Sequence, residues 1–309
     1  MTNSDFRDPR LTEQRNPRTE RIDVASSLEI VDLMNAEDAT VAGAVRGQRE
    51  QMAEAIDLVV AALQQGGRLV YVGAGTSGRL GVLDAAECPP TFGTPPTMVV
   101  GVIAGGYGAL VKSVEGAEDD VNAGAAAMDS GGVTARDIVV GIAASGTTPY
   151  VGAALARAQT LGAKTALVTC STPPKLLTET CDVVIVPLVG PEALTGSTRL
   201  KAGTATKLVL NTISTGAMIR LGKVYGNMMV DLMALSQKLK DRGERIVMEC
   251  GGVDRATARA AIEQAGGSVK LAIVMAKAGM RREEAERVLK EAGGLVRRAV
   301  GDPPPVTRP

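Results

Sequence analysis

The feature that most constrains the fold is a series of five short apolar runs in the middle of the chain. The runs are rich in valine and isoleucine and apolar throughout, as are strands that are buried on both faces of a sheet. They cover residues 68–73, 97–103, 137–142, 164–169 and 182–186. Helical segments lie between them, and this alternation predicts an α/β fold with a parallel five-stranded sheet and helices on both faces. Ligands of such sheets bind at the carboxyl ends of the strands.

The first run leads into a glycine-rich loop that has the properties of a phosphate site. Residues 73–79 read Gly-Ala-Gly-Thr-Ser-Gly-Arg and lie between the expected strand and a helix. Glycines let backbone N–H groups approach an anion, and the free N–H groups at a helix N-terminus favour negative charge. Hydroxyl and guanidinium groups add further donors. The candidate ligand-binding residues here are Gly75, Thr76, Ser77, Gly78 and Arg79.

This loop has two other interpretations, a tight turn without a ligand and part of a dinucleotide site. A dinucleotide-binding fold usually places an Asp or Glu about 20 residues further on, at the end of its second strand. Here the second run ends at Ile103 and is followed by Ala-Gly-Gly, without an acid. The sequence therefore favours a phosphate site over a dinucleotide site.

A second loop of the same kind follows the third run. Residues 145–149 read Ser-Gly-Thr-Thr-Pro, and the proline suits the first turn of the helix that is expected to follow. Two such loops at strand ends of one sheet favour a phosphorylated ligand. The further candidate ligand-binding residues are Ser145, Gly146, Thr147 and Thr148.

The chain contains no histidine, which limits its chemistry. A Ser-His-Asp triad and histidine-rich zinc sites are excluded, so acid–base steps would use other side chains or the substrate itself. A carboxylate near the phosphate loops is then a leading candidate for a base, although a run of acids is more often a solvated helix start. Composition does not choose among the acids of the segment between the loops, which are Glu115, Glu118, Asp119 and Asp120.

A polar loop rich in hydrogen-bond donors, residues 190–199, follows the fifth run. A long helix is expected after it, from about residue 199 to residue 221. Lys201 and Lys207 lie in the first turns of this helix, where either could bind a phosphate or a sugar. An exposed lysine without a ligand is at least as common. Lys201 is included among the candidate ligand-binding residues.

Composition argues against several other classes of protein. Net charge is zero and aromatic residues make up 2% of the chain, so we expect no nucleic-acid surface. No run approaches the ~20 apolar residues of a membrane span, and the polar N-terminus lacks the apolar core of a signal peptide. The four cysteines include no Cys-x-x-Cys pair and are typical of reduced thiols. We therefore expect a cytoplasmic protein without a metal or another cofactor.

The chain is expected to consist of four segments. Residues 1–20 form a polar N-terminal tail, and residues 21–248 form the main domain with its flanking helices. Residues 249–300 contain three short helical segments separated by glycine-containing turns, which predicts a small C-terminal three-helix bundle. Residues 301–309 are proline-rich and are expected to be a disordered tail.

Two further helices are expected within the main domain. The helix after the first glycine loop is expected to end near residues 87–90, because Pro89 and Pro90 cannot continue it. This places Glu87 about two to three helical turns from the loop. Residues 227–242 are expected to form another helix.

Taken together, these motifs resemble those of the N-acetylmuramic acid 6-phosphate etherase family. The resemblance extends from about Thr19 into the C-terminal bundle. It implies a sugar isomerase (SIS) domain, a sheet between helices that binds phosphosugars, followed by a bundle similar to a ubiquitin-associated (UBA) fold. The segments that carry it are residues 73–79, 84–91, 103–106, 114–119, 141–147 and 200–204.

The resemblance also implies a reaction and its residues. The family cleaves the D-lactyl ether at C3 of its substrate and gives N-acetylglucosamine 6-phosphate and D-lactate. A base removes the C2 proton of the open-chain aldehyde, lactate leaves, and water adds. The matching residues are Glu87 as the acid for the departing lactate and Glu118 as the base. The resemblance further implies a homodimer with sites near the subunit interface, and no metal or cofactor.

Two other functions are compatible with the same fold. A phosphosugar isomerase also needs a carboxylate base beside an aldehyde, but isomerisation needs no acid for an ether leaving group, so the Glu87-Cys-Pro-Pro element argues against it. A non-catalytic phosphosugar-binding regulator is the second alternative. The presence of both Glu87 and Glu118 argues against a loss of chemistry.

Overall fold

The computed structural model describes residues 8, 10–232 and 237–306. The chain forms two compact units. The first consists of Met1–Ala86 and Pro96–Ser214, and the second of Glu87–Pro95 and Thr215–Pro309.

The first unit is built on a parallel five-stranded sheet, as the apolar runs predict. The strand order is β2-β1-β3-β4-β5, and each strand runs parallel to its neighbours. All five residues of β1 and all five residues of β3 are buried. This burial explains why the two strands contain no polar positions. The strands are β1 (Leu69–Gly73), β2 (Val99–Ile103), β3 (Ile138–Ile142), β4 (Lys164–Val168) and β5 (Val183–Ile185).

The strand order places a topological switch point between β1 and β3. The chain leaves β1 toward β2 on one side of the sheet, and it continues from β3 toward β4 and β5 on the other. The final residues of the two central strands, Gly73 and Ile142, lie in register. The crevice of an open α/β sheet lies at such a point, beyond the carboxyl ends of the strands. Both glycine-rich loops begin there.

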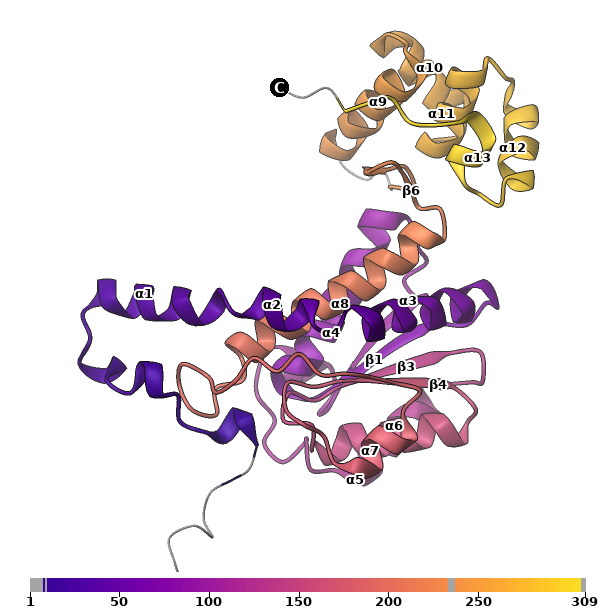
Figure 1. The fold of residues 1–309 in the computed structure, drawn as a ribbon. Coiled ribbons are helices and arrows are strands. Elements are labelled where there is room, and N and C mark those ends of the chain that lie inside the picture. Colours follow the sequence, from indigo (N-terminus) through magenta and orange to yellow (C-terminus); the bar gives the residue numbers. More distant parts are fainter. Residues whose placement is uncertain (1–7, 9, 233–236, 307–309) are drawn as a thin grey trace, which may run out of the picture. The chain divides into compact units, whose positions relative to one another are not determined.

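Helices cover both faces of this sheet (Figure 1). On one face, α3 (Arg49–Gln64) contacts β1, β3 and β5. On the other, α6 (Pro149–Thr160) contacts β1, β3 and β4, and α5 (Val121–Ser130) packs closely against α6. Val70, Val139 and Leu155 belong to the apolar core on that side. The remaining helices that begin in this unit are α1 (Ser27–Asp38), α2 (Val41–Arg46), α4 (Gly75–Phe92), α7 (Lys175–Thr180) and α8 (Lys201–Arg220).

The expectation that Pro89 and Pro90 end α4 near residues 87–90 is wrong, because the helix runs through both prolines to Phe92. A proline lacks an N–H donor, but its fixed φ is helical and its carbonyl still accepts. The N–H of Gly93 donates to the carbonyl of Pro89 at 2.9 Å. The prolines therefore weaken the last turn of α4 without ending the helix before it.

The N-terminal segment is folded where the structure describes it. It forms the 3-10 turns η1 (Leu11–Glu13), η2 (Pro17–Thr19) and η3 (Ile22–Val24) before α1 begins. Ser26 and Glu29 form a capping box at the start of α1. We refer to residues 10–24 as the arm. The expected tail of residues 1–20 thus contains ordered turns from Leu11 onward.

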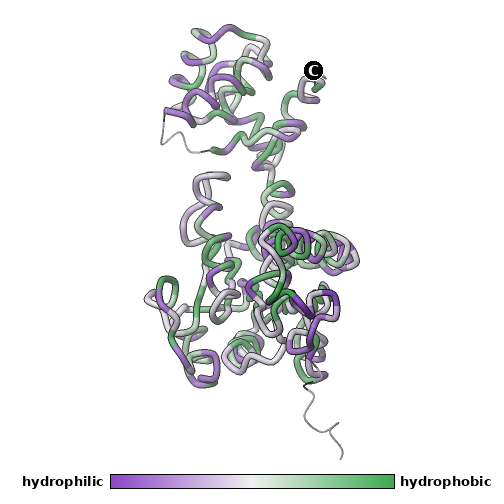
Figure 2. The backbone as a smooth tube through the Cα atoms, turned by 90° about the vertical axis from the view of Figure 1, so that its left-hand side faces the viewer, coloured by the Kyte–Doolittle hydropathy of each residue, from purple (hydrophilic) through white to green (hydrophobic). Residues whose placement is uncertain are grey.

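The second unit contains a short hairpin and a group of helices with their own core. Val269–Met275 of α11 are all buried, and the other helices surround them. Hydrophilic and hydrophobic residues alternate along these helices (Figure 2). The three expected helices correspond to α10, α11 and α12. The elements are β6 (Val224–Tyr225), β7 (Met228–Met229), α9 (Gln237–Gly251), α10 (Arg255–Gln264), α11 (Val269–Ala278), α12 (Arg282–Glu291) and α13 (Val296–Val300).

The expected helix over residues 227–242 is wrong in its first part. Met228 and Met229 form the second strand of the hairpin, and the left-handed φ of +60° at Gly226 allows the turn between the strands. Helix α9 begins at Gln237 and contributes buried residues to the same core as α10 and α11. The domain boundary at residue 249 stays a prediction. In the described part of the chain, no helix has the length and apolar character needed to cross a membrane.

Candidate functional site

The loop after β1 is shaped by the close approach of the strand to the first turn of α4. A Cβ atom on Gly73 would lie 2.7 Å from the backbone nitrogen of Gly78, and one on Gly78 would lie 2.7 Å from the carbonyl oxygen of Gly73. Neither position can hold a side chain without a backbone shift. Gly75 differs, because its φ is +52° and its Cβ direction is open. The loop thus turns bare backbone toward open space at the start of a helix.

The loop after β3 ends at the N-terminus of α6. Gly146 has a φ of +74°, and the backbone N–H of Thr147 donates to Oγ of Ser145 at 3.3 Å. Pro149 occupies the first turn of α6. The N-terminus of a second helix therefore lies at the switch point, together with the hydroxyls of Ser145 and Thr148. The N–H groups of Tyr150 and Val151 in its first turn already donate to the carbonyls of Glu118 and Thr148.

Two cavities of about 320 Å³ each lie at these loops. They have Ala74, Gly75 and Glu118 in common. The cavity between the two loops, called the cradle cavity below, is lined by Arg10, Glu13, Ala74, Gly75, Thr76, Ser77, Glu118, Ala144, Ser145, Thr148, Gly196 and Thr198. The adjoining cavity is lined by Ala74, Gly75, Arg79, Ala104, Ala109, Ser113, Val114, Glu115, Gly116, Ala117 and Glu118.

The four acids that composition could not separate have different positions. Glu118 has an exposed side chain and lines both cavities, whereas Glu115 lines only the adjoining one. Asp120 is the N-cap of α5, where it accepts from the N–H of Ala123 at 2.8 Å. Asp119 lines neither cavity. By position, Glu118 is the best placed of the four to act on a ligand in the cradle cavity.

Backbone contacts fix the position of Glu118. Its carbonyl accepts from the N–H of Tyr150 at 2.9 Å, which joins the acidic segment to the first turn of α6. Helices α5 and α6 approach each other closely next to this hydrogen bond. A Cβ atom on Gly124 would lie only 2.2 Å from the carbonyl oxygen of Tyr150. A carboxylate held by its backbone in this way can keep its side chain free for chemistry.

The predicted ligand-binding residues divide into three groups. Gly75, Thr76, Ser77, Ser145 and Thr148 line the cradle cavity, and Arg79 lines the adjoining one. Gly78, Gly146, Thr147 and Lys201 line neither. Gly78 and Gly146 shape their loops, since a Cβ on Gly146 would lie 3.0 Å from Oγ1 of Thr169. Thr147 contacts the arm, because Nη1 of Arg10 donates a hydrogen bond to its Oγ1 at 3.3 Å.

The two predicted cations, Arg79 and Lys201, have partners within the protein. Nε and Nη2 of Arg79 donate to the carbonyls of Leu110 and Ala109 at 3.0 and 2.7 Å. Nζ of Lys201 is 2.5 Å from Oε2 of Glu37, and both side chains are 1% exposed. Lys201 therefore lies in a buried ion pair, a position that does not support a contact with substrate.

The structure adds residues to the cavity that the sequence did not indicate. Arg10 and Glu13 come from the arm, within the segment expected to be a tail. No motif surrounds Arg10, so only its position identifies it. Gly196 and Thr198 come from the polar loop of residues 190–199, whose richness in donors was the available signal.

Arg10 and Asp8 form a close pair at the rim of this cavity. Nε of Arg10 donates to both carboxylate oxygens of Asp8 at 2.9 and 3.0 Å, and Nη2 also pairs with Oδ2. These hydrogen bonds lower the pKa of the Asp8 carboxyl to about 2, so Asp8 is ionised at neutral pH.

Glu87, the second predicted carboxylate, lies on α4 with an exposed side chain. It belongs to the second compact unit and lines neither of the two cavities. Its role therefore stays a prediction.

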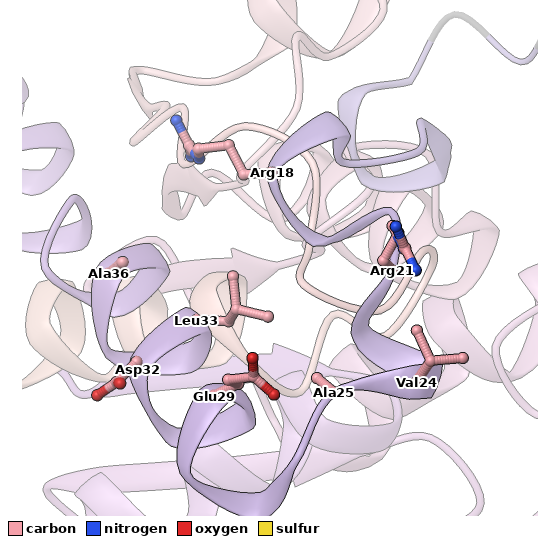
Figure 3. Close-up of a pocket in the computed structure, with 8 residues that line it drawn as sticks. All are labelled: Arg18, Arg21, Val24, Ala25, Glu29, Asp32, Leu33 and Ala36. Carbon is pink, nitrogen blue, oxygen red and sulfur yellow. The ribbon is translucent and has the colours of Figure 1, made fainter.

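A larger cavity, of about 610 Å³, lies between the arm and α1 (Figure 3). Glu29 and Leu33 of α1 point toward Val24 and Ala25 of the chain that precedes the helix. It has no lining residue in common with the cradle cavity. It is lined by Arg18, Arg21, Val24, Ala25, Glu29, Asp32, Leu33 and Ala36.

Comparison with known proteins agrees with the fold and identifies the family. Residues 51–159 match the family model of the glucokinase regulatory protein N-terminal SIS domain. In solved structures, the fold is similar to that of a Bacteroides fragilis protein described as a phosphosugar isomerase involved in capsule formation. The TM-score is 0.50 at 19% identity, over 70% of this chain and 97% of that one.

Relatives of much higher identity cover most of the sequence. The N-acetylmuramic acid 6-phosphate etherase of Serratia proteamaculans is 57% identical over 265 residues, which are 86% of this chain and 89% of the relative. The enzyme of the same name from Pectobacterium atrosepticum is 56% identical over 265 residues, 86% of this chain and 87% of the relative. At this identity and coverage, the chain belongs to the N-acetylmuramic acid 6-phosphate etherase family.

Proposed function

We propose that this protein is a carbon–oxygen lyase that cleaves the D-lactyl ether of N-acetylmuramic acid 6-phosphate. The products would be N-acetylglucosamine 6-phosphate and D-lactate, which assigns it to the recycling or catabolism of cell-wall sugars. The names of its relatives support this activity. The observation that carries it is the cradle cavity, where two helix N-termini and several hydroxyls lie beside the carboxylate of Glu118.

The phosphate would bind between the two loops. Backbone N–H groups at the start of α4 and the hydroxyls of Thr76, Ser77, Ser145 and Thr148 provide donors of the kind that phosphate accepts. Binding at this group, remote from the bond that breaks, would orient C2 and C3 of the sugar toward Glu118.

The reaction would be an elimination followed by addition of water. In the open-chain sugar, the aldehyde acidifies the C2 proton, and the carboxylate of Glu118 would remove it. The electron pair of the C2–H bond becomes the C2–C3 double bond, and lactate leaves with the pair of the C3–O bond. Water then adds its oxygen to C3 and a proton returns to C2. General acid–base catalysis of this kind contributes about 10²–10⁴-fold.

Glu87 is our candidate for the acid that protonates the departing lactate. The assignment rests on the Ala-Glu-Cys-Pro-Pro element, in which the exposed Glu87 occupies the position of the family's acid. This role requires a protonated carboxyl where Glu118 requires an ionised one, so the two environments must differ during the reaction.

The test is incubation of the purified protein with N-acetylmuramic acid 6-phosphate in deuterated water. We expect D-lactate together with N-acetylglucosamine 6-phosphate that carries deuterium at C2. Lactate without C2 deuterium would keep the etherase assignment and favour either direct displacement or an elimination in which the abstracted proton, shielded from solvent, returns to C2. Saturable binding without lactate would contradict the etherase and favour a phosphosugar-binding regulator. Aldose–ketose interconversion without lactate would favour an isomerase.

We also infer that the protein is a cytoplasmic homodimer. Val24, Leu28 and Val31 are 67%, 71% and 56% exposed, and such apolar surface on and before α1 favours burial against a second copy. The four cysteines are thiols rather than disulfides, as is usual in a reducing compartment. Sedimentation analysis should show a dimer for the wild type and a monomer for a Leu28→Glu, Val31→Glu variant. A monomeric wild type would contradict the dimer, and a dimeric variant would contradict the role of α1.

A further inference from the structure

We propose that Arg10 of the arm binds the phosphate group of the substrate. In the absence of substrate, the carboxylate of Asp8 pairs with Arg10, and the phosphate takes the place of this carboxylate on binding. This inference rests on the proposed function, because it assigns the phosphosugar to the cradle cavity. It makes the segment before the sheet domain part of the binding site, although the sequence there carries no phosphate motif.

The charges around the cavity are the first argument. Among the described residues that line the cradle cavity, Arg10 is the single cation, and Glu13 and Glu118 are carboxylates. A phosphate dianion would enter a cavity whose fixed side-chain charges are otherwise negative. The cations that sequence patterns suggested do not line it, since Arg79 faces the adjoining cavity and Lys201 pairs with Glu37. Arg10 is therefore the residue available to neutralise the ligand.

The orientation of the guanidinium is the second argument. Its Nε and Nη2 edge faces Asp8, while Nη1 donates to Oγ1 of Thr147 in the loop after β3. The group thus lies against the loop whose Ser145 and Thr148 hydroxyls line the cavity. The edge now paired with Asp8 has the fork geometry that binds two oxygens of a phosphate.

The attachment of the arm is the third argument, because a binding residue must be held in place. The carbonyl of Thr12 accepts from the N–H of Gly196 at 2.9 Å. Nδ2 of Asn16 donates to the carbonyl of Pro191 at 3.2 Å, and Oγ1 of Thr19 donates to that of Ala193 at 2.8 Å. Arg10 precedes these anchors by only a few residues. The loop to which the arm is hydrogen-bonded also contributes Gly196 and Thr198 to the cavity.

Asp8 competes with a phosphate for the guanidinium of Arg10. The carboxylate of Asp8 holds the two donors that a phosphate would use, so a ligand must displace it. The pair is solvent-accessible at both side chains, and exposed pairs contribute little. A doubly charged phosphate that also binds at the N-terminus of α4 would therefore displace Asp8 at little cost. Removal of Asp8 should strengthen phosphate binding, opposite to the effect of removing Arg10.

The test measures binding of inorganic phosphate and of N-acetylglucosamine 6-phosphate by calorimetry, in the full-length protein. Arg10→Gln should weaken both by about tenfold, as loss of a charge-assisted contact does. Arg10→Lys should restore part of the affinity, and Asp8→Asn should tighten binding by up to about fivefold. The matched control is Arg15→Gln, an exposed arginine of the same arm that lines no cavity described here, which should leave binding unchanged.

Kinetics separate a binding role from a structural one. Arg10→Gln should raise KM for the etherase reaction by a similar factor and leave kcat within about twofold. Equal phosphate affinity in Arg10→Gln and the wild type would overturn the inference, and so would equal losses in Arg10→Gln and Arg15→Gln. An Arg10-dependent affinity for N-acetylmuramic acid without phosphate would also overturn it, because Arg10 would then bind the lactyl carboxylate.

The same measurements distinguish this inference from the proposed function. Phosphate binding that depends on Arg10, without formation of lactate, would leave the inference standing and remove the etherase. Lactate formation with phosphate binding that is indifferent to Arg10 would keep the etherase and remove the inference.

Discussion

The two sides of the cradle cavity are held in place by different kinds of interaction. On one side, the loops after β1 and β3 continue directly from buried strands into helices. Backbone packing at Gly73 and Gly78 fixes the shape of the first loop, and the close approach of Gly146 to Thr169 constrains the second. On the other side, the arm and the loop of residues 190–198 are joined by side-chain hydrogen bonds between segments about 175 residues apart. One side is made by backbone geometry and the other by long-range polar contacts.

This difference predicts that the two sides respond differently to substitution. Changes on the loop side should act through steric overlap, or through direct loss of chemistry at Glu118. Changes on the arm side should act by leaving buried polar groups without partners, and should alter affinity through the position of Arg10.

Glu118→Gln should lower kcat by about 10²–10⁴-fold, because the amide cannot accept the C2 proton. The fold should persist, since the contact that positions residue 118 is made by its backbone carbonyl. Steady-state kinetics and thermal unfolding give the two readouts. Glu115→Gln is the matched control, an acid three residues away that lines only the adjoining cavity. Near-normal turnover in Glu118→Gln would remove this residue from the mechanism.

Lys201→Met should lower the free energy of unfolding by about 3 kcal/mol, because it leaves the buried carboxylate of Glu37 without one of its cations. The comparison is Lys175→Met, which breaks an exposed pair with Glu179 and should cost less than about 0.5 kcal/mol. Chemical denaturation measures both. Equal small losses of unfolding free energy in the two variants would show that the buried pair of Lys201 and Glu37 contributes no more than a surface contact.

Gly73→Ala should cost about 2 kcal/mol, since its Cβ would overlap backbone atoms at 2.7 Å that cannot rotate away. Gly43→Ala offers the contrast, because Gly43 lies in α2 with nothing within 4 Å of its Cβ direction. That change should be neutral or stabilising, as alanine is favoured over glycine in helices. Equal stability of the two variants would contradict a backbone-packed loop.

The acid sensitivity of the arm side follows from Glu37. Hydrogen bonds from Arg18 and Lys201 lower the pKa of this carboxyl from 4.5 to about 2. Because the pKa is lower in the folded state, its stabilisation is complete above pH 4.5 and is lost as the pH falls toward 2. The stability difference between the wild type and Glu37→Gln should therefore shrink in that window, by up to about 1.4 kcal/mol per pH unit. A difference that is constant with pH would contradict the lowered pKa.

The same division explains how much the sequence could predict. The five strands and the two glycine-rich loops each carry a local pattern, and the structure has strands at all five runs. The hairpin at Met228 was missed because its residues suit a helix as well as a strand, and only tertiary packing decides between them. Arg10 and Glu13 were missed because their place at the cavity depends on contacts far along the chain. Lys201 had a plausible local position, but its pairing with Glu37 could not be read from either segment alone.

Thr19→Val should have the smallest effect, and it isolates the arm from the chemistry of the cavity. The change keeps the shape of this 5% exposed side chain but removes the hydroxyl that donates to the carbonyl of Ala193. An unpaired buried carbonyl of this kind costs about 1 kcal/mol. Thr160→Val is the matched control, because its hydroxyl is exposed and donates only within α6, to the carbonyl of Ala156.

Affinity decides what the Thr19 anchor contributes to function. If the anchor holds the arm in register for Arg10, Thr19→Val should weaken phosphate binding more than Thr160→Val does, while kcat stays near the wild-type value. In an Arg10→Gln background, the Thr19 change should then have no further effect on affinity, since the residue it positions is already absent. Additive losses in the double variant would show that the arm stabilises the fold without serving the cavity.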